Sequence, residues 1–193
     1  MAAWVWIIIA IAALAAVCAV AWAAWRRRRS GALRQTFGPE YERTVNEAGD
    51  RRRGESELDA RRKRRQKLDI RPLTPAARQR YSDEWQNTQA RFVDDPRGAI
   101  READRLVGDL METRGYPMGD FEQRAADISV NHPKVVTNYR AAHRVAVSSD
   151  EGKADTENLR TAMVHYRALF EELLETPINL ADRREERYRA RAS

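Results

Sequence analysis

Three histidines are the side chains in this sequence best suited to acid–base or metal chemistry. His132 stands before a proline where a helix is expected to start, and His143 and His165 lie on or beside the apolar faces of two predicted helices. A hydrogen-bonded or exposed histidine is more common at such positions than a metal ligand. We therefore predict a structural role for each histidine.

The acidic residues and the single cysteine also lack the pattern of a reactive site. Asp104 and Glu112 can share a helix face, but the Glu-x-x-His spacing of a helical di-metal site is missing. The sequence contains no nucleophile elbow, no phosphate-binding glycine loop and no His-Glu-x-x-His. Cys18 alone can form neither an intramolecular disulfide nor a cysteine-based zinc site. We predict a non-enzymatic protein with no catalytic, cofactor-binding or metal-binding residue and no cofactor.

The charge of this 193-residue chain, +6 in total, is unevenly distributed. Residues 2–25 carry no charged side chain, whereas residues 26–80 hold 18 basic and 8 acidic residues, a net charge of +10. Hydropathy and charge together predict four segments. They are a transmembrane helix at 2–25, a basic and partly helical juxtamembrane connector at 26–72, a helical bundle domain at 73–175, and a charged, disordered tail at 176–193.

The apolar segment is long enough for a membrane span. Its 24 residues, at about 1.5 Å each in a helix, exceed a hydrocarbon layer of about 30 Å. The residues expected at the membrane interface are Trp4, Trp6, Trp22, Trp25, Arg26, Arg27, Arg28 and Arg29. Because the arginines follow the apolar run, the positive-inside rule predicts a single-pass protein of a bacterial inner membrane, with its amino terminus outside and its carboxyl-terminal domain cytoplasmic.

A cleaved signal peptide is the alternative interpretation of the same segment. Residues 19–21 read Ala-Val-Ala, the small-x-small form that signal peptidase recognises. A signal peptide carries its positive charge before the apolar run, and here the arginines come after it. The anchor is therefore the favoured hypothesis.

The sequence of the connector predicts charged helices, and it contains no heptad repeat of a coiled coil. Pro39 suits the first turn of one helix, and Gly54 is expected to weaken the next. The favoured interpretation is an exposed charged spacer. The alternative is a polybasic site for anionic lipid or nucleic acid, although residues 50–80 contain no aromatic side chain that could stack on bases.

The region after residue 72 has the pattern of a helical bundle. Thr74 before Pro75 and Asp95 before Pro96 predict helix starts, and Gly115 predicts a helix end. Apolar residues recur at intervals of three and four, so we predict an all-α fold with a bundle of about four to five helices. The expected inward-facing residues include Tyr81, Trp85, Phe92, Leu106, Val107, Leu110, Met111, Phe121, Val136, Tyr139, His143, Val147, Met163, Tyr166, Phe170 and Leu173.

Several segments resemble a known bacterial family. They are FGPEYERTV (37–45), KLDIRPLTP (67–75), RFVDDP (91–96), GYPMGDFEQRAADISVNHP (115–133), NYRAAH (138–143) and LRTAMVHYRALFEELL (159–174). The sequence is similar to uncharacterised single-pass membrane proteins, some labelled hypothetical or secreted. This resemblance implies an amino-terminal anchor, a charged connector and a helical domain, and it brings no activity or catalytic residue.

Two functions follow as hypotheses. The first is a membrane-anchored, non-enzymatic cytoplasmic interaction module that contacts the lipid bilayer and binds a protein partner. The second is a polyanion-binding protein that uses its basic connector for anionic lipid or nucleic acid. Polar and aromatic side chains within the quoted segments form the candidate partner surface: Tyr116, Met118, Asp120, Glu122, Arg124 and Tyr139.

Overall fold

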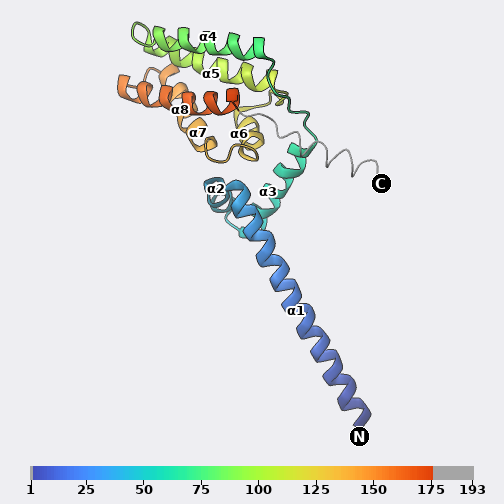
Figure 1. Ribbon diagram of the computed structural model, residues 1–193. Helices are drawn as coiled ribbons and strands as arrows, with labels where there is room; N and C mark the ends of the chain where they lie inside the picture. Colours follow the sequence, from blue (N-terminus) through green and yellow to red (C-terminus); the bar gives the residue numbers. More distant parts are fainter. Residues whose placement is uncertain (1, 176–193) are drawn as a thin grey trace. The chain divides into compact units, whose positions relative to one another are not determined.

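The chain folds into α-helices. A computed structural model describes residues 2–175, without the side chains of residues 2, 3, 5–10 and 12, and over these residues it holds helices and no strand (Figure 1). The predicted all-α class is confirmed. Contacts within the chain define a first unit, Met1–Asp59, and a second unit, Ala60–Ser193. The predicted tail at 176–193 lies outside the described residues.

Three helices begin in the first unit: α1 (Ala2–Phe37), α2 (Pro39–Ala48) and α3 (Arg51–Gln66), which continues into the second unit (Figure 1). Pro39 occupies the first turn of α2, as predicted. The turns on either side of α2 contain Gly38 and Gly49, with φ angles of 49° and 66°. Glycine suits both positions because it has no Cβ to oppose a positive φ.

The prediction of a transmembrane helix at residues 2–25 is wrong, and so is the single-pass topology that was based on it. Among the described residues, no helix has an apolar stretch long enough to cross a bilayer. α1 continues past the arginines at 26–29 to Phe37, because its backbone hydrogen bonds do not depend on side-chain polarity.

The first unit buries side chains from all three of its helices, namely Leu33, Phe37, Tyr41 and Leu58. α3 also passes close to α2 at Gly54, where an added Cβ would lie 2.8 Å from Val45 Cα. Gly54 therefore permits the close approach of two backbones. The connector packs here as folded structure, in contrast to the exposed spacer that the sequence favoured.

The described part of the second unit forms a bundle of α4 (Pro75–Arg91), α5 (Pro96–Thr113), α6 (Phe121–Ser129), α7 (Val136–Asp150) and α8 (Thr156–Glu175) (Figure 1). Thr74 Oγ1 accepts a hydrogen bond from the Ala77 N–H over 3.1 Å, which confirms the predicted helix start. Asp95 caps α5 in the same way, accepting from the Gly98 N–H over 2.9 Å.

α7 begins later than the sequence predicts. The Val135 and Val136 N–H groups both donate to the His132 carbonyl oxygen, so a separate turn precedes the helix. The inward face of α7 carries Ala142 and Ala146, which are buried, whereas Val147 is exposed. Val147 follows Ala146 by one position and thus points about 100° away from that face.

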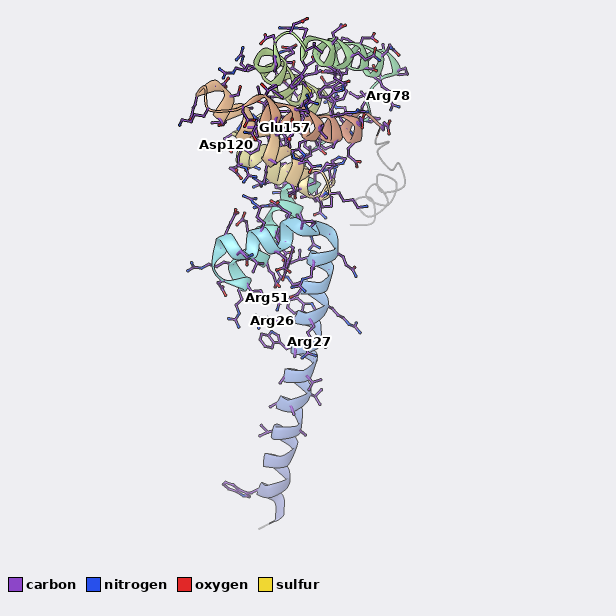
Figure 2. All side chains as sticks on the ribbon, turned by 90° about the vertical axis from the view of Figure 1, so that its left-hand side faces the viewer. Arg26, Arg27, Arg51, Arg78, Asp120 and Glu157 are labelled. Carbon is purple, nitrogen blue, oxygen red and sulfur yellow. The ribbon has the colours of Figure 1, made fainter. Side chains whose placement is uncertain are left out.

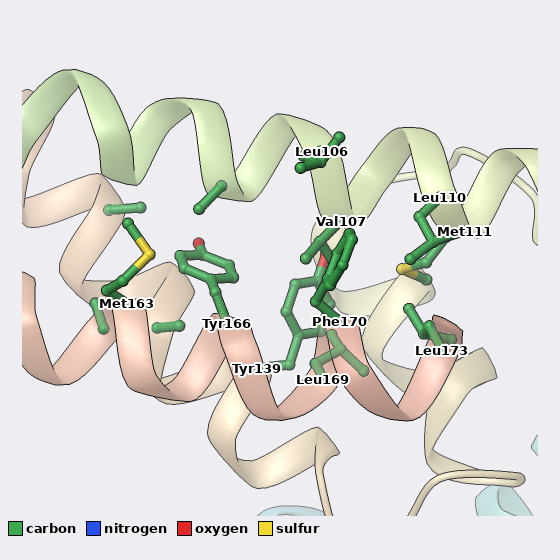
Figure 3. Close-up of a cluster of buried hydrophobic side chains, with 14 of the residues drawn as sticks. Leu106, Val107, Leu110, Met111, Tyr139, Met163, Tyr166, Leu169, Phe170 and Leu173 are labelled. Atoms are coloured by element: carbon green, nitrogen blue, oxygen red, sulfur yellow. The ribbon is translucent and has the colours of Figure 1, made fainter. Parts of the chain in front are cut away.

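The bundle core lies between α5 and α8 and is completed by α7 (Figure 3). Its buried side chains include Leu106, Val107, Leu110, Met111, Tyr139, Met163, Tyr166, Leu169, Phe170 and Leu173. Trp85 of α4 stacks on Phe170 of α8, with ring centroids 4.6 Å apart. Phe92 and Phe121, which the sequence also placed inward, pack against this core while only partly buried.

A glycine turn fixes the segment that leads into the bundle. Gly115 has a φ of 94°, and a Cβ there would lie 2.4 Å from the Asp69 carbonyl oxygen. The Arg71 N–H donates to the Arg114 carbonyl oxygen over 2.8 Å. The predicted helix end at Gly115 is thus confirmed, and the glycine leaves room for the backbone of the incoming chain.

Candidate functional site

The six residues of the candidate partner surface occupy different environments. Tyr116 and Tyr139 are buried in the second unit, and Met118 and Asp120 are exposed. Asp120 caps α6, because its Oδ1 accepts from the Gln123 N–H over 2.7 Å. These four residues therefore do not form one continuous surface.

Glu122 and Arg124, the remaining two of the six, make contacts within the bundle. Glu122 pairs with the buried guanidinium of Arg140 on α7. Arg124 donates to the Gly119 carbonyl oxygen over 3.0 Å, and its Nε lies 3.4 Å from the Tyr139 hydroxyl. Both side chains thus connect α6 to its surroundings.

A polar cluster forms around Asp104, where residues of α5, α7 and α8 meet. The Tyr166 hydroxyl donates to Asp104 Oδ1 over 2.7 Å, and His143 Nδ1 lies 3.4 Å from the same oxygen. Phe121 of α6 stacks on the imidazole, with ring centroids 3.7 Å apart. Because an ionised carboxylate can only accept, His143 Nδ1 is the donor of this pair.

The electrostatics of this cluster favour a charged Asp104. Burial opposes ionisation of its carboxyl, but hydrogen bonds from His143 and Tyr166 outweigh that effect and place the pKa of Asp104 below its usual value. Burial, together with the Asp104 charge, raises the pKa of the Tyr166 phenol, which stays a donor at neutral pH. The cluster orients an imidazole, and the described residues contain no group of three or more side chains that could hold a metal.

The other two histidines lie apart from this cluster. His132 is buried, with Nδ1 3.0 Å from Glu172 Oε1. Burial lowers the pKa of this imidazole more than the nearby carboxylate raises it. His165 is half-buried on α8. His132 and His143 thus each lie beside a carboxylate, Glu172 and Asp104 respectively.

Three acidic side chains of the first unit are buried, namely Glu40, Glu55 and Asp59. The buried carboxylate of Glu55 accepts hydrogen bonds from Ser30 Oγ (2.6 Å), the Tyr41 hydroxyl (2.8 Å) and Arg51 Nε (2.9 Å). Burial opposes ionisation of Glu55, but these donors outweigh it and hold the pKa of the carboxyl below its ordinary value. Buried Asp59 pairs with Arg29 in the same unit.

Of the other arginines in the first unit, Arg27 and Arg52 are exposed and Arg26 is half-buried. Within residues 2–175, Arg26, Arg27 and Arg52 form no ion pair with an acidic side chain. Buried Glu55 and Asp59 instead pair with Arg51 and Arg29. Figure 2 shows Arg26 and Arg27 of α1 close to Arg51 of α3.

Two cavities, of about 320 and 290 Å³, share Trp22 and Arg26. The Arg26 guanidinium lies over the Trp22 ring, 5.6 Å from its centroid, and Arg29 lies similarly over Trp25 at 5.7 Å. The larger cavity is lined by Trp22, Trp25, Arg26, Arg29, Arg52, Glu55 and Ser56, and the smaller by Trp22, Ala23, Arg26, Arg27, Ser30 and Arg51.

The sequence does not predict this combination of side chains. Trp22 and Trp25 lie in the predicted apolar segment, Arg52 lies in the basic connector, and residues 50–80 contain no aromatic side chain. The structure places Trp22 and Trp25 in a cavity with Arg52 of α3. Helical spacing within one segment carries no signal for such a contact, since it depends on how α1 and α3 pack.

A third cavity, of about 410 Å³, lies between the loops before α5 and α8. Two of its acidic residues already have structural partners. Asp95 accepts from the Gly98 N–H, and Asp155 Oδ1 accepts from the Asn158 N–H over 2.7 Å. These carboxylates therefore serve as helix caps.

Comparisons of the chain with models of protein families, with curated proteins and with solved structures find no match. The resemblance to a bacterial family and the cytoplasmic location of the bundle therefore stay predictions.

Proposed function

We propose that the protein is a non-enzymatic helical binding module whose first unit binds a polyanion. The observation that carries this proposal is the pair of cavities around Trp22 and Arg26, which also gather Arg27 and Arg52. None of these arginines has an acidic partner among the described residues. Each can therefore meet an external anion without first breaking an internal ion pair.

The chemistry of the side chains suits phosphate-bearing anions. A guanidinium donates two parallel hydrogen bonds to phosphate or carboxylate oxygens, and a cleft lined by one sign of charge concentrates counter-ions. Trp22 and Trp25 add aromatic surface beside the arginines, which removes the objection that the basic connector has no aromatic neighbour.

The test is the binding of the full chain to heparin at increasing salt concentration. We expect affinity to fall steeply with ionic strength, because the contacts are between exposed charges. The double variant Arg26→Gln, Arg52→Gln should bind more weakly and with a shallower salt dependence. The matched control is Arg78→Gln with Arg144→Gln, which removes two exposed arginines from the second unit. Salt-independent binding, or an equal loss in the control, contradicts the proposal.

Protein binding by the bundle is a second candidate function. It is favoured by the stacked rings of Phe121 and His143, which are only partly buried beside polar Asp104. Aromatic side chains with a polar surround are frequent anchors of protein interfaces. Crosslinking with the full chain should capture a defined protein that is lost with Phe121→Ala and kept with Arg78→Gln. Capture that Phe121→Ala leaves unchanged counts against this function.

A further inference from the structure

We propose that the anion bound by the first unit is the headgroup of an anionic phospholipid, held at the two cavities that share Trp22 and Arg26. This inference rests on the polyanion-binding function proposed above. It names the ligand class and the residues that contact it.

Both cavities are lined by several arginine side chains. Arg26 lines both cavities, Arg52 lines the larger one and Arg27 the smaller one. Each cavity thus combines two guanidinium groups that have no acidic partner among residues 2–175. Figure 2 shows two of these arginines, Arg26 and Arg27, side by side on α1. The two guanidiniums around each cavity can both donate hydrogen bonds to the exposed oxygens of a negatively charged phosphodiester.

The carboxylate in the larger cavity does not oppose this ligand strongly. Glu55 lines the cavity, but it accepts hydrogen bonds from Ser30, Tyr41 and Arg51. The positive charge of Arg51 balances its negative charge at 2.9 Å. An incoming phosphate therefore meets an already neutralised pair together with the open guanidiniums.

The apolar surroundings distinguish a lipid from a nucleic acid. On α1, before Trp22, the side chains of Leu14, Val17 and Val20 are 65%, 65% and 69% exposed. A phospholipid supplies a phosphate for the arginines and hydrocarbon for these aliphatic side chains, whereas a nucleic acid supplies no comparable apolar partner. Trp22 and Trp25 lie between the two kinds of side chain, where an amphipathic indole is favourable.

The experiment measures binding of the full chain to phosphatidylcholine vesicles with and without phosphatidylglycerol. We expect binding only with the anionic lipid. Arg26→Gln and Arg52→Gln should each weaken it about fivefold, the factor that corresponds to about 1 kcal/mol. Trp22→Ala, which removes the ring common to both cavities and no charge, should weaken binding at every salt concentration.

Arg28→Gln is the matched control, because Arg28 is exposed in the same stretch of α1 but lines neither cavity. Far-ultraviolet circular dichroism verifies that each variant is folded. If Arg28→Gln and Arg26→Gln weaken vesicle binding equally, the proposed site is wrong and the binding is a general electrostatic attraction to the basic surface. Unchanged vesicle binding by Trp22→Ala overturns it as well.

Competition separates the possible sources of phosphate. Soluble glycerol phosphate and single-stranded DNA should displace vesicles poorly. Full displacement by glycerol phosphate would identify a free phosphate ligand, and full displacement by DNA would identify a nucleic acid partner, so either result overturns the lipid inference. Heparin binding with no vesicle binding refutes only this inference, whereas loss of both refutes the proposed function too.

Discussion

Glu55 is the residue on which the hydrogen bonding of the first unit converges. Its substitution Glu55→Gln should cost about 1–3 kcal/mol of unfolding free energy, since the amide lacks the negative charge that strengthens the three hydrogen bonds and pairs with Arg51. The cost should be measured by urea unfolding. Glu42→Gln, at an exposed carboxylate paired with Arg34, is the control and should change stability by less than about 0.5 kcal/mol. Equal effects of the two substitutions would show that burial of Glu55 does not matter.

His132 gives the bundle a dependence on pH. Its pKa is lowered in the folded state, so the unfolded chain binds the proton more readily. The unfolding free energy should therefore rise with pH up to the unfolded pKa of about 6.5 and then level off, and it should fall on acidification. Urea unfolding measured over this range should show this rise of the unfolding free energy with pH in the natural chain and in His165→Asn. The rise should be smaller in His132→Asn, and an unchanged rise in that variant rules out His132 as its source.

At single residues, the sequence predicts what local structure determines. Thr74 and Asp95 were recognisable as caps, because a cap bonds to an N–H three residues later. The role of Glu55 as a buried acceptor was not recognisable, because its donor Ser30 is 25 residues away along the chain. For the same reason Asp104 and His143 were noted separately, and their proximity emerged only from the packing of α5 against α7.

At the scale of elements, the crossing of α2 and α3 depends on a missing side chain. Gly54→Ala should destabilise the first unit by about 1–3 kcal/mol, because its Cβ would meet the Val45 backbone. Gly31→Ala is the matched substitution within a helix, and nothing lies within 4 Å of its added Cβ. It should stabilise α1 by about 0.5–1 kcal/mol. Thermal unfolding should give opposite signs for the pair, and a shared sign contradicts the close crossing.

The helices of the bundle were predictable because caps and apolar periodicity coincide there, as at Pro75 and Pro96. The extent of α1 was not predictable from composition. Residues 2–25 have the composition of a membrane span, whereas the helix continues to Phe37. The packing of α3 was hidden for another reason. After Gly54, the apolar residues of α3 are Leu58 and Ala60, and the rest are charged or polar. The helix therefore shows no apolar stripe.

Among residues 2–175, each of the two units buries apolar side chains of its own. Leu110→Ala should cost about 2–5 kcal/mol, and hydrogen exchange should accelerate at amides of α5 and α8 while those of α2 keep their protection. Leu33→Ala, at an equally buried leucine of the first unit, should give the reverse pattern. Faster exchange in both units from either variant would show a single cooperative fold.

The placement of Trp85 gives each unit its own optical signal. It is the one tryptophan of residues 60–193, and it is buried against Phe170. Trp4, Trp22 and Trp25 of the first unit are exposed. Emission from a buried indole lies at shorter wavelength than emission from a hydrated one. Tryptophan fluorescence of the natural chain therefore reports on both units without an added dye. Emission at shorter wavelengths comes from Trp85 in the bundle, and emission at longer wavelengths comes from the exposed tryptophans of the first unit.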